Sequence, residues 1–254
     1  MKLLKFFLPL FICSAIIISC GPSEAPSNPS VSFSISMDDP GSHYYLVQMH
    51  CSELSQDNLT LRLPAWTPGY YMVLNLAQHI VDFSPKDSAA NPLEWTKTDK
   101  NAWQINTKGV SELDVQYYVY ANRRSVAEPY LDSLKGFISP TGIFMHPEKI
   151  ISIPVKISIN PWTEWTQVST GLAAFGSERF TYQSKDFDEL YDCPILVGNQ
   201  TVAEFEVEQV PHYLSIENAG SADLERLKSD VKRIVQTSTE LMGEIPYEIS
   251  MSNK

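Results

Sequence analysis

Leu113-Asp114-Val115-Gln116-Tyr117-Tyr118-Val119 is the stretch that decides the fold class. Its apolar side chains recur at every second position, which places them together on one face of a β-strand. The same alternation returns in short runs from about residue 31 to residue 210. Many short strands separated by Gly, Pro and Asn predict a mainly β fold, an antiparallel β-sandwich or saddle. Other clear runs are 31–35, 59–63, 151–159 and 203–207.

The run at 151–159 carries Ile or Val at every odd position. Pro154 stands on its polar face. Because proline has no backbone N–H to donate to a neighbouring strand, we expect this strand to lie at an edge of its sheet.

The periodicity changes near Pro211. Residues 212–217 form one more alternating run, and apolar residues then follow helical spacing through 224–242, with charged residues on the opposite face. This pattern predicts a long amphipathic helix. Ser221 is the expected N-cap, and Gly243 is placed to end the helix.

A further strand is expected to start at residue 245, just after the helix. The resulting strand–helix–strand order has no partner layer on which to close. Residues 211–254 are therefore expected to be the opening piece of a truncated α/β domain, and residues 31–210 an all-β domain.

The N-terminus has the features of a bacterial lipoprotein signal peptide, which we assign to residues 1–19. Lys2 and Lys5 supply a basic region, and the apolar stretch that follows, about 13 residues, is too short to span a bilayer. Ile17-Ile18-Ser19-Cys20 resembles a lipobox, so Cys20 is the expected lipidation site. The alternative is an ordinary signal sequence that happens to end near a cysteine.

Residues 20–30 are rich in Pro and Ser and are expected to form a flexible linker between the lipid and the first domain. The lipid on Cys20 would hold the protein on a membrane of the bacterial cell envelope, facing the periplasm or the cell exterior.

Charge and cysteine content limit the possible functions. The chain has 19 basic and 30 acidic residues, a net charge of −11, which argues against binding the phosphates of a nucleic acid. Beyond the signal and Cys20, only Cys51 and Cys193 remain, too few for a cysteine-rich zinc site. A disulfide between them and two buried thiols both stay open.

No catalytic or metal-binding motif is present in this chain. None of the five histidines belongs to a His-Glu-x-x-His sequence, and there is no G-x-S-x-G elbow or P-loop. His43 and His50 are expected to be solvated or hydrogen-bonded. We therefore assign no catalytic residues, no metal ligands and no cofactor to the chain itself.

Aromatic residues concentrate in turns. Trp66, Tyr70 and Tyr71 stand beside Pro68 and Gly69, and Trp162 and Trp165 lie together further along. Aromatic side chains in loops often bind peptides or sugars, whereas the alternative is that these rings plug the ends of the sandwich. Gly69 is placed to adopt a positive φ in a tight turn.

Leu63-Pro64-Ala65-Trp66-Thr67-Pro68-Gly69-Tyr70-Tyr71, with Ala77-Gln78-His79-Ile80 after it, resembles the motif "LPxWxPGxY…AxHI". This motif is found in the N-terminal domain of the glycyl aminopeptidase family, peptidase family M-sixty-one. Residues 186–194 resemble the family's "DxDxLxDSP", with Cys193 in place of the usual Ser. Segments 118–121, 126–132 and 142–144 agree in the same order.

The resemblance implies an all-β domain that precedes a thermolysin-like zinc peptidase domain, which removes N-terminal Gly or Ala. The zinc-binding motif and its distal Glu are absent from this chain, so zinc and a peptide substrate are expected only in a full-length relative. On this basis the chain is expected to be the non-catalytic N-terminal portion of a membrane-anchored aminopeptidase-like lipoprotein, which shapes the substrate cleft and supports the catalytic domain. The alternative is a surface-anchored peptide- or glycan-binding β-sandwich module that uses Trp66, Tyr70 and Tyr71.

Overall fold

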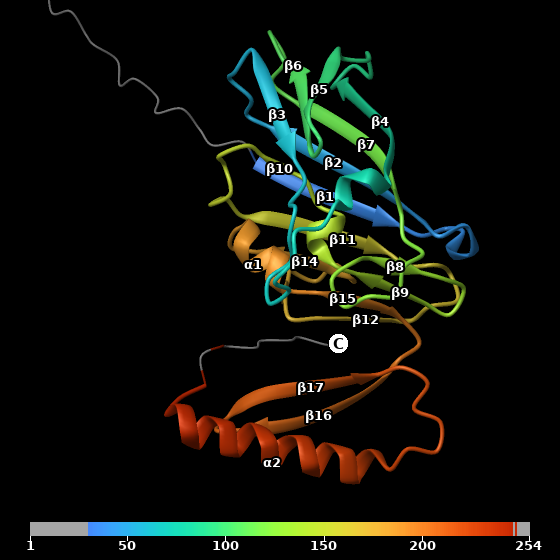
Figure 1. Ribbon diagram of the computed structural model, residues 1–254, viewed down its shortest axis with the longest axis vertical. Helices are drawn as coiled ribbons and strands as arrows, with labels where there is room; N and C mark the ends of the chain where they lie inside the picture. The colour runs from blue at the N-terminus through green and yellow to red at the C-terminus, as the bar shows by residue number, and fades with distance from the viewer. Residues whose placement is uncertain (1–29, 246, 248–254) are drawn as a thin grey trace, which may run out of the picture.

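The computed structural model describes residues 30–245 and Tyr247 (Figure 1). The predicted signal peptide, Cys20 and most of the strand expected at 245–249 lie outside the described residues. Within the described residues, no helix has the length and apolar character needed to cross a membrane.

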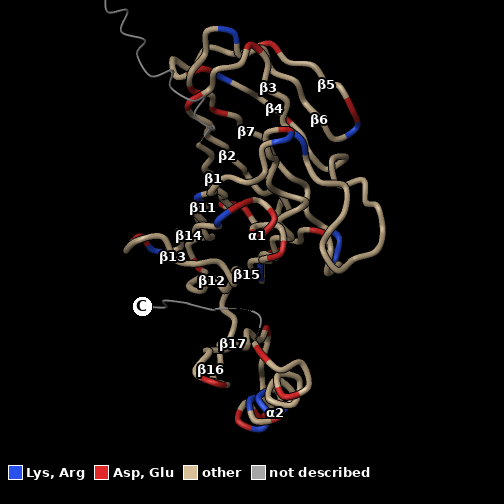
Figure 2. Tube along the Cα trace, turned by 90° about the vertical axis from the view of Figure 1, so that its left-hand side faces the viewer, with Lys and Arg blue, Asp and Glu red and all other residues tan. Residues whose placement is uncertain are grey.

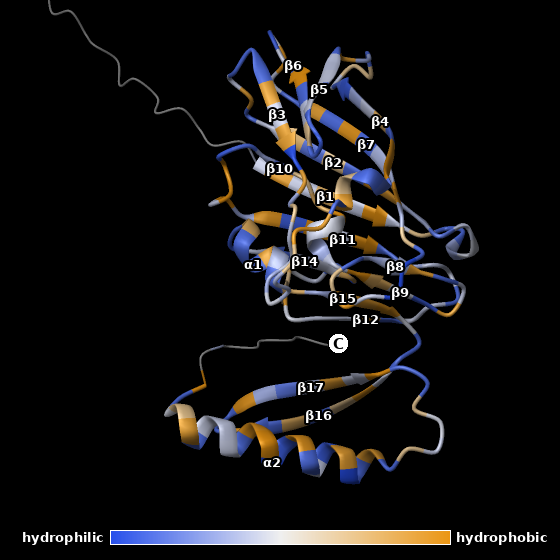
Figure 3. Cartoon of the chain, viewed as in Figure 1, coloured by the Kyte–Doolittle hydropathy of each residue, from blue (hydrophilic) through white to orange (hydrophobic). Residues whose placement is uncertain are grey.

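The largest sheet has seven strands in the order β13-β14-β11-β1-β2-β7-β4. Every second side chain of β1 is buried, as the alternation predicts, and the same holds for β2 and β7. Figure 3 shows hydrophobic and hydrophilic residues alternating along β7. The predicted mainly β fold is confirmed. The strands are β1 (Ser30–Ser36), β2 (Tyr44–Ser52), β4 (Ile80–Asp87), β7 (Leu113–Tyr120), β11 (Val155–Asn160), β13 (Ala173–Ala174) and β14 (Thr181–Ser184).

Two four-stranded sheets accompany the large one, in the orders β10-β3-β6-β5 and β12-β15-β9-β8. The first consists of β10 (His146–Pro147), β3 (Asn58–Arg62), β6 (Ala102–Asn106) and β5 (Trp95–Asp99). The second consists of β12 (Gln167–Thr170), β15 (Ile195–Gly198), β9 (Lys135–Ile138) and β8 (Tyr130–Leu131). Short helices connect the strands: η1 (Pro40–Ser42), η2 (Leu76–His79), η3 (Pro140–Gly142) and α1 (Phe187–Asp192).

The three sheets share one apolar core. Phe83 of β4 stacks on Trp103 of β6, with ring centroids 5.5 Å apart, which joins the large sheet to the first small one. Phe33 of β1 packs edge-on against Phe144 at 4.9 Å. The Tyr45 hydroxyl donates to the Tyr130 carbonyl at 2.8 Å, which ties the large sheet to β8.

The expectation that Pro154 marks an edge strand is wrong. β11 begins one residue after Pro154 and pairs with β1 on one side, in parallel, and with β14 on the other. A proline next to the first strand residue removes no bond from the ladder, so the strand can occupy the middle of the sheet.

The chain continues into a two-stranded hairpin and one helix. β16 (Thr201–Val207) pairs with β17 (Val210–Ile216), and α2 (Leu224–Met242) packs against β16 (Figure 1). The division expected between residues 210 and 211 therefore falls inside a hairpin. We propose to place it near residue 200, before β16.

The ends of α2 are set by local hydrogen bonds. Asp223, rather than Ser221, is the N-cap: its carboxylate accepts from the Arg226 backbone N–H at 3.0 Å. Both residue types are good caps, but a carboxylate also interacts favourably with the positive end of the helix dipole. Gly243 ends the helix with φ +90°, as predicted.

Cys51 and Cys193 are both free thiols. Cys51 is buried near the end of β2, and burial raises the pKa of its thiol to about 12. Burial also raises the pKa of Cys193 to about 11. Both groups are therefore protonated at neutral pH, which leaves them poor nucleophiles.

Candidate functional site

Residues 64–74, between β3 and η2, form a loop that exposes large apolar side chains; we call it the aromatic loop. Trp66 is 57% exposed and Tyr71 is 99% exposed, and Met72 and Val73 beside them are also open to solvent. These rings do not plug the sandwich. Trp165 does behave in that way, since it is buried and packs against Trp162.

A tight turn forms the tip of the aromatic loop. The Tyr70 backbone N–H donates to the Thr67 carbonyl at 3.0 Å, with Pro68 and Gly69 between them. Gly69 has φ +74°, so the predicted positive φ is confirmed. Pro followed by Gly at these two positions is the sequence preference of a type II turn.

A backbone hydrogen bond joins the two ends of the aromatic loop. The Leu74 backbone N–H donates to the Ala65 carbonyl at 2.6 Å. Just beyond, Leu76 and Ala77 of η2 are buried in the core. The backbone hydrogen bond between Leu74 and Ala65 therefore holds the two ends of the loop together between β3 and η2.

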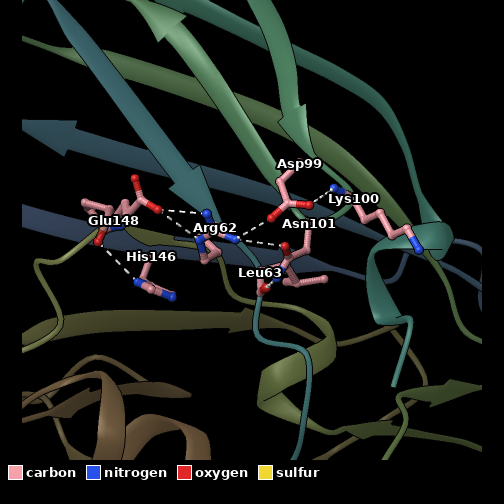
Figure 4. A network of polar contacts seen from close by, with 8 residues as sticks. Arg62, Leu63, Asp99, Lys100, Asn101, His146 and Glu148 are labelled. Atoms are coloured by element: carbon pink, nitrogen blue, oxygen red, sulfur yellow. Dashed lines mark hydrogen bonds and ion pairs between the residues drawn. The ribbon is translucent and has the colours of Figure 1, made fainter. Parts of the chain in front are cut away.

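A network around Arg62 holds the start of the loop (Figure 4). The guanidinium donates to Glu148 Oε1 at 2.7 Å and to Asn101 Oδ1 at 3.0 Å. Asn101 in turn makes two hydrogen bonds with Leu63. The Asn101 side-chain amide donates to the Leu63 carbonyl at 2.6 Å, and the Leu63 N–H donates to the Asn101 backbone carbonyl at 2.9 Å. The Arg62 side chain thereby fixes where the loop begins.

Thr67 fixes the flank of the loop. Its hydroxyl donates to the Ala127 carbonyl at 3.1 Å and lies 2.7 Å from the Thr141 hydroxyl of η3. Three segments distant in sequence, 63–71, 126–132 and 140–144, therefore meet at one place. The family resemblance identified 63–71, 126–132 and 142–144 without predicting that they meet. Thr141 lies just before the last of these segments, and the parts played by Arg62 and Thr141 were not predicted.

The histidines are dispersed. His50 bonds Asp114 at 2.8 Å and His43 bonds the Leu131 carbonyl, so the hydrogen-bonded interpretation of both is confirmed. Among the described residues, no three His, Cys, Asp or Glu side chains converge as metal ligands. These residues do not fit a catalytic zinc centre, which needs three protein ligands, and we derive no chemistry through one.

Comparison with solved structures finds an aminopeptidase N family protein from Idiomarina loihiensis, with a TM-score of 0.79 and 26% sequence identity. The match covers 86% of this chain and 38% of that protein, so the chain spans well under half of the relative's length. An M1 zinc metallopeptidase from Deinococcus radiodurans is far less similar, with a TM-score of 0.41 and 8% identity over 87% of this chain and 54% of that one.

A comparison with curated proteins finds no match. Among protein families, the Peptidase M61 N-terminal domain matches residues 32–199. This range contains the aromatic loop and nearly all of the three sheets, which together we call the sheet unit, residues 30–200. The match covers well over half of the chain and agrees with the resemblance carried by residues 63–80. The chain therefore belongs to the peptidase M61 family, of which it contains the N-terminal domain.

Proposed function

We propose that this chain is the non-catalytic N-terminal portion of a membrane-anchored aminopeptidase-like lipoprotein, and that its aromatic loop forms one wall of a peptide cleft. The observation that carries the proposal is the combination of exposure and fixation in this loop. Tyr71 is almost fully exposed, although the Thr67 hydroxyl bonds the Ala127 carbonyl and the Leu74 N–H closes the loop onto the Ala65 carbonyl.

Exposed apolar side chains that lie together mark contact sites in soluble proteins. A mobile loop could fold its rings back onto the protein surface. The hydrogen bonds at Leu63, Thr67 and Leu74 oppose this. A loop held in one shape also loses little conformational entropy when a ligand or a neighbouring domain packs on it.

In this proposal, zinc and the peptide substrate belong to the full-length protein. The support is the length of the Idiomarina relative, of which this chain matches 38%. The sheet unit would position the aromatic loop beside a separate catalytic domain and would itself take no part in bond breaking.

Membrane attachment through Cys20 is part of the proposal. Several acyl chains on one cysteine give the stable anchoring that a single chain does not. Expressed with its signal, the wild-type protein should partition with membranes, whereas Cys20→Ala should be released or left unprocessed. A Cys20→Ala protein with the wild-type mature mass that still sediments with membranes would contradict the lipid anchor.

The second candidate is a stand-alone peptide- or glycan-binding module. It is favoured by the exposure of Trp66 and Tyr71 within this chain, because aromatic faces also stack on sugars.

Titration of the purified chain, followed by the indole N–H signal of Trp66 in NMR spectra, tests both candidates. We expect tri-alanine to shift this signal and chitotriose to leave it in place. Tyr71→Ala, which keeps the Trp66 indole, should abolish the response, while Trp95→Ala, which removes another partly exposed indole, should preserve it. A shift with chitotriose alone would favour the glycan module. No shift with either ligand would contradict direct contact between the loop and a substrate.

A further inference from the structure

A row of uncharged polar side chains crosses the outer face of the large sheet. The register places Ser34 of β1 between Ser158 of β11 and Gln48 of β2. Gln48 in turn stands opposite Gln116 of β7, and Gln116 stands opposite Ser84 of β4. These five strands are consecutive neighbours in the sheet (Figure 1). We call these five residues the polar row.

The two glutamines at the centre of the polar row have unused hydrogen-bonding groups. Gln48 and Gln116 are both exposed, and within the described part of the chain neither side-chain amide bonds another protein group. Each carboxamide offers two N–H donors and one carbonyl acceptor. The Ser34 hydroxyl accepts from the Asn160 amide at 2.9 Å and still has its own proton to donate. Donors and acceptors therefore stand side by side along the row.

The polar row forms the floor of a hollow. All five of its residues line a depression of about 560 Å³, a volume within the range of roughly 300–1,000 Å³ found for small-molecule sites. Because neighbouring strands lie about 4.8 Å apart, the row is about 19 Å long from β11 to β4. The hollow is therefore suited to an elongated ligand.

Charged side chains beside the polar row compensate one another. Lys156, Lys86 and Asp114 line the same hollow. Lys156 Nζ lies 3.2 Å from a carboxylate oxygen of Glu178, and Lys86 stands opposite Asp114 in the register. His50 Nδ1 also lies 2.8 Å from Asp114 Oδ1. Because the two lysines are matched by two carboxylates, the hollow favours an uncharged ligand over an anion or a cation.

Three tyrosines continue the same face of β2 and β7. Tyr118 is two residues from Gln116 along β7 and therefore points to the same side of the sheet. The Tyr44 ring lies 6.4 Å from that of Tyr118 and 5.1 Å from that of Tyr120, measured between centroids. Tyr44 and Tyr120 are each more than one-third exposed. Such rings offer an apolar face together with a hydroxyl group, which matches the two kinds of surface on a sugar.

We infer that the polar row binds an uncharged oligosaccharide, with sugar hydroxyls on Gln48 and Gln116 and an adjoining sugar ring on Tyr118. A sugar hydroxyl both donates and accepts a hydrogen bond, as the carboxamide and serine groups of the row do. An extended peptide fits this place less well. Peptides that add to a sheet bond the free backbone of an edge strand, whereas the row crosses the face of inner strands, whose backbone groups are paired.

This site is separate from the proposed function, because no residue of the aromatic loop lines the hollow. The two proposals are tested by different signals: the Trp66 indole for the loop, and the side-chain amides of Gln48 and Gln116 for the polar row.

Isothermal titration of the purified chain with cellohexaose, maltohexaose and chitohexaose tests the inference, since these neutral probes differ in linkage and substituents. We expect at least one to bind, and the anionic hexagalacturonate to bind more weakly than that probe. The double variant Gln48→Ala/Gln116→Ala should weaken binding by about tenfold or more, because it removes several hydrogen bonds of about 1 kcal/mol each. Gln104→Ala is the matched control, because this exposed glutamine of β6 lies outside the hollow, and it should bind as wild type.

NMR spectra of the wild type locate the bound sugar without any variant. The side-chain amide signals of Gln48 and Gln116 should shift on addition of the best neutral probe, while the Trp66 indole signal stays in place. Binding by none of the three neutral probes would overturn the inference, as would tighter binding of hexagalacturonate or unchanged affinity in the double variant. A shift of the Trp66 signal with both glutamine signals unmoved would place the sugar at the aromatic loop and would also overturn it.

Discussion

The sheet unit, residues 30–200, and the hairpin–helix unit, residues 201–245, treat their apolar side chains differently. In the sheet unit, Tyr117 and Phe144 have no exposed surface. In the hairpin–helix unit, Leu227 is 37% exposed, Ile234 63% and Leu241 84%. These three residues recur every seven positions and form a stripe along α2, which we call the α2 stripe.

The difference shows which apolar faces the described residues can bury by themselves. The inner strands of the large sheet have partners on both sides, and two further sheets share its apolar core. α2 has one two-stranded sheet beside it, which covers only one of its faces. Its polar side carries charges of both signs (Figure 2), including the pairs Lys228–Glu225 and Arg233–Asp230. The α2 stripe lies on neither the packed nor the charged side, so its burial requires a further layer.

The largest expected effect is in the core of the sheet unit. Phe144→Ala should lower the free energy of unfolding by about 3–5 kcal/mol, because it removes a fully buried ring and leaves a cavity. Urea denaturation followed by circular dichroism measures this. Phe175→Ala, which removes a ring that is 37% exposed, is the control and should cost far less. Equal losses would mean that the core is not closed as described.

Gly69→Val is expected to cause the second-largest loss of stability. At φ +74° a β-branched residue is strained, and the cost should be about 1–3 kcal/mol. No heavy atom lies within 4 Å of an added Cβ, so the effect would come from the backbone and not from a clash. Gly41→Val, at a position without a positive φ, serves as the control in thermal melts. An unchanged melting temperature for Gly69→Val would show that the aromatic loop is not held in its turn.

Much of this fold could be predicted from the sequence, because a period of two is imposed by the strand itself. Strands β1, β3 and β7 follow the alternation closely, and α2 follows its helical spacing. The order of strands in the sheets could not be predicted in this way. The parallel pairing of β1 with β11 joins residues more than 120 positions apart, and nothing local specifies it.

The candidate site was predicted in part. The Pro68-Gly69 turn has a local sequence preference, so its geometry was predictable. The supports of the loop are long-range: Arg62 reaches Glu148, and Thr67 reaches Ala127 and Thr141. Single residues of these types occur throughout any sequence, and only the folded chain brings them together.

Low pH should destabilise the sheet unit by protonating Asp132. Burial alone would raise the pKa of this carboxyl, but hydrogen bonds from the Tyr130 hydroxyl and from the backbone of Leu134 and Lys135 outweigh it, and the pKa lies below its ordinary value of 3.8. A lowered folded-state pKa stabilises the protein above that ordinary value, and this contribution is lost as the pH falls through the folded pKa.

The unfolding midpoint of the wild type should therefore fall more steeply than that of Asp132→Asn as the pH drops below about 4. The control is Asp38→Asn, which changes an exposed carboxyl group elsewhere in the sheet unit. Parallel pH profiles for wild type and Asp132→Asn would contradict this role of the carboxylate.

The smallest effect on stability is expected at the α2 stripe, although its effect on association should be clear. Ile234→Ser and Leu241→Ser replace exposed side chains, so each should change the free energy of unfolding by about 0.5 kcal/mol or less. Because exposed apolar stripes promote association, both variants should remain monomeric at concentrations where the wild type self-associates in sedimentation velocity runs. Val235→Ser, which changes a more buried position one residue along the helix, is the matched control and should lower stability without improving solubility. If Ile234→Ser destabilised the protein as much as Val235→Ser, the stripe would already be packed in solution, and the contrast between the two units would be lost.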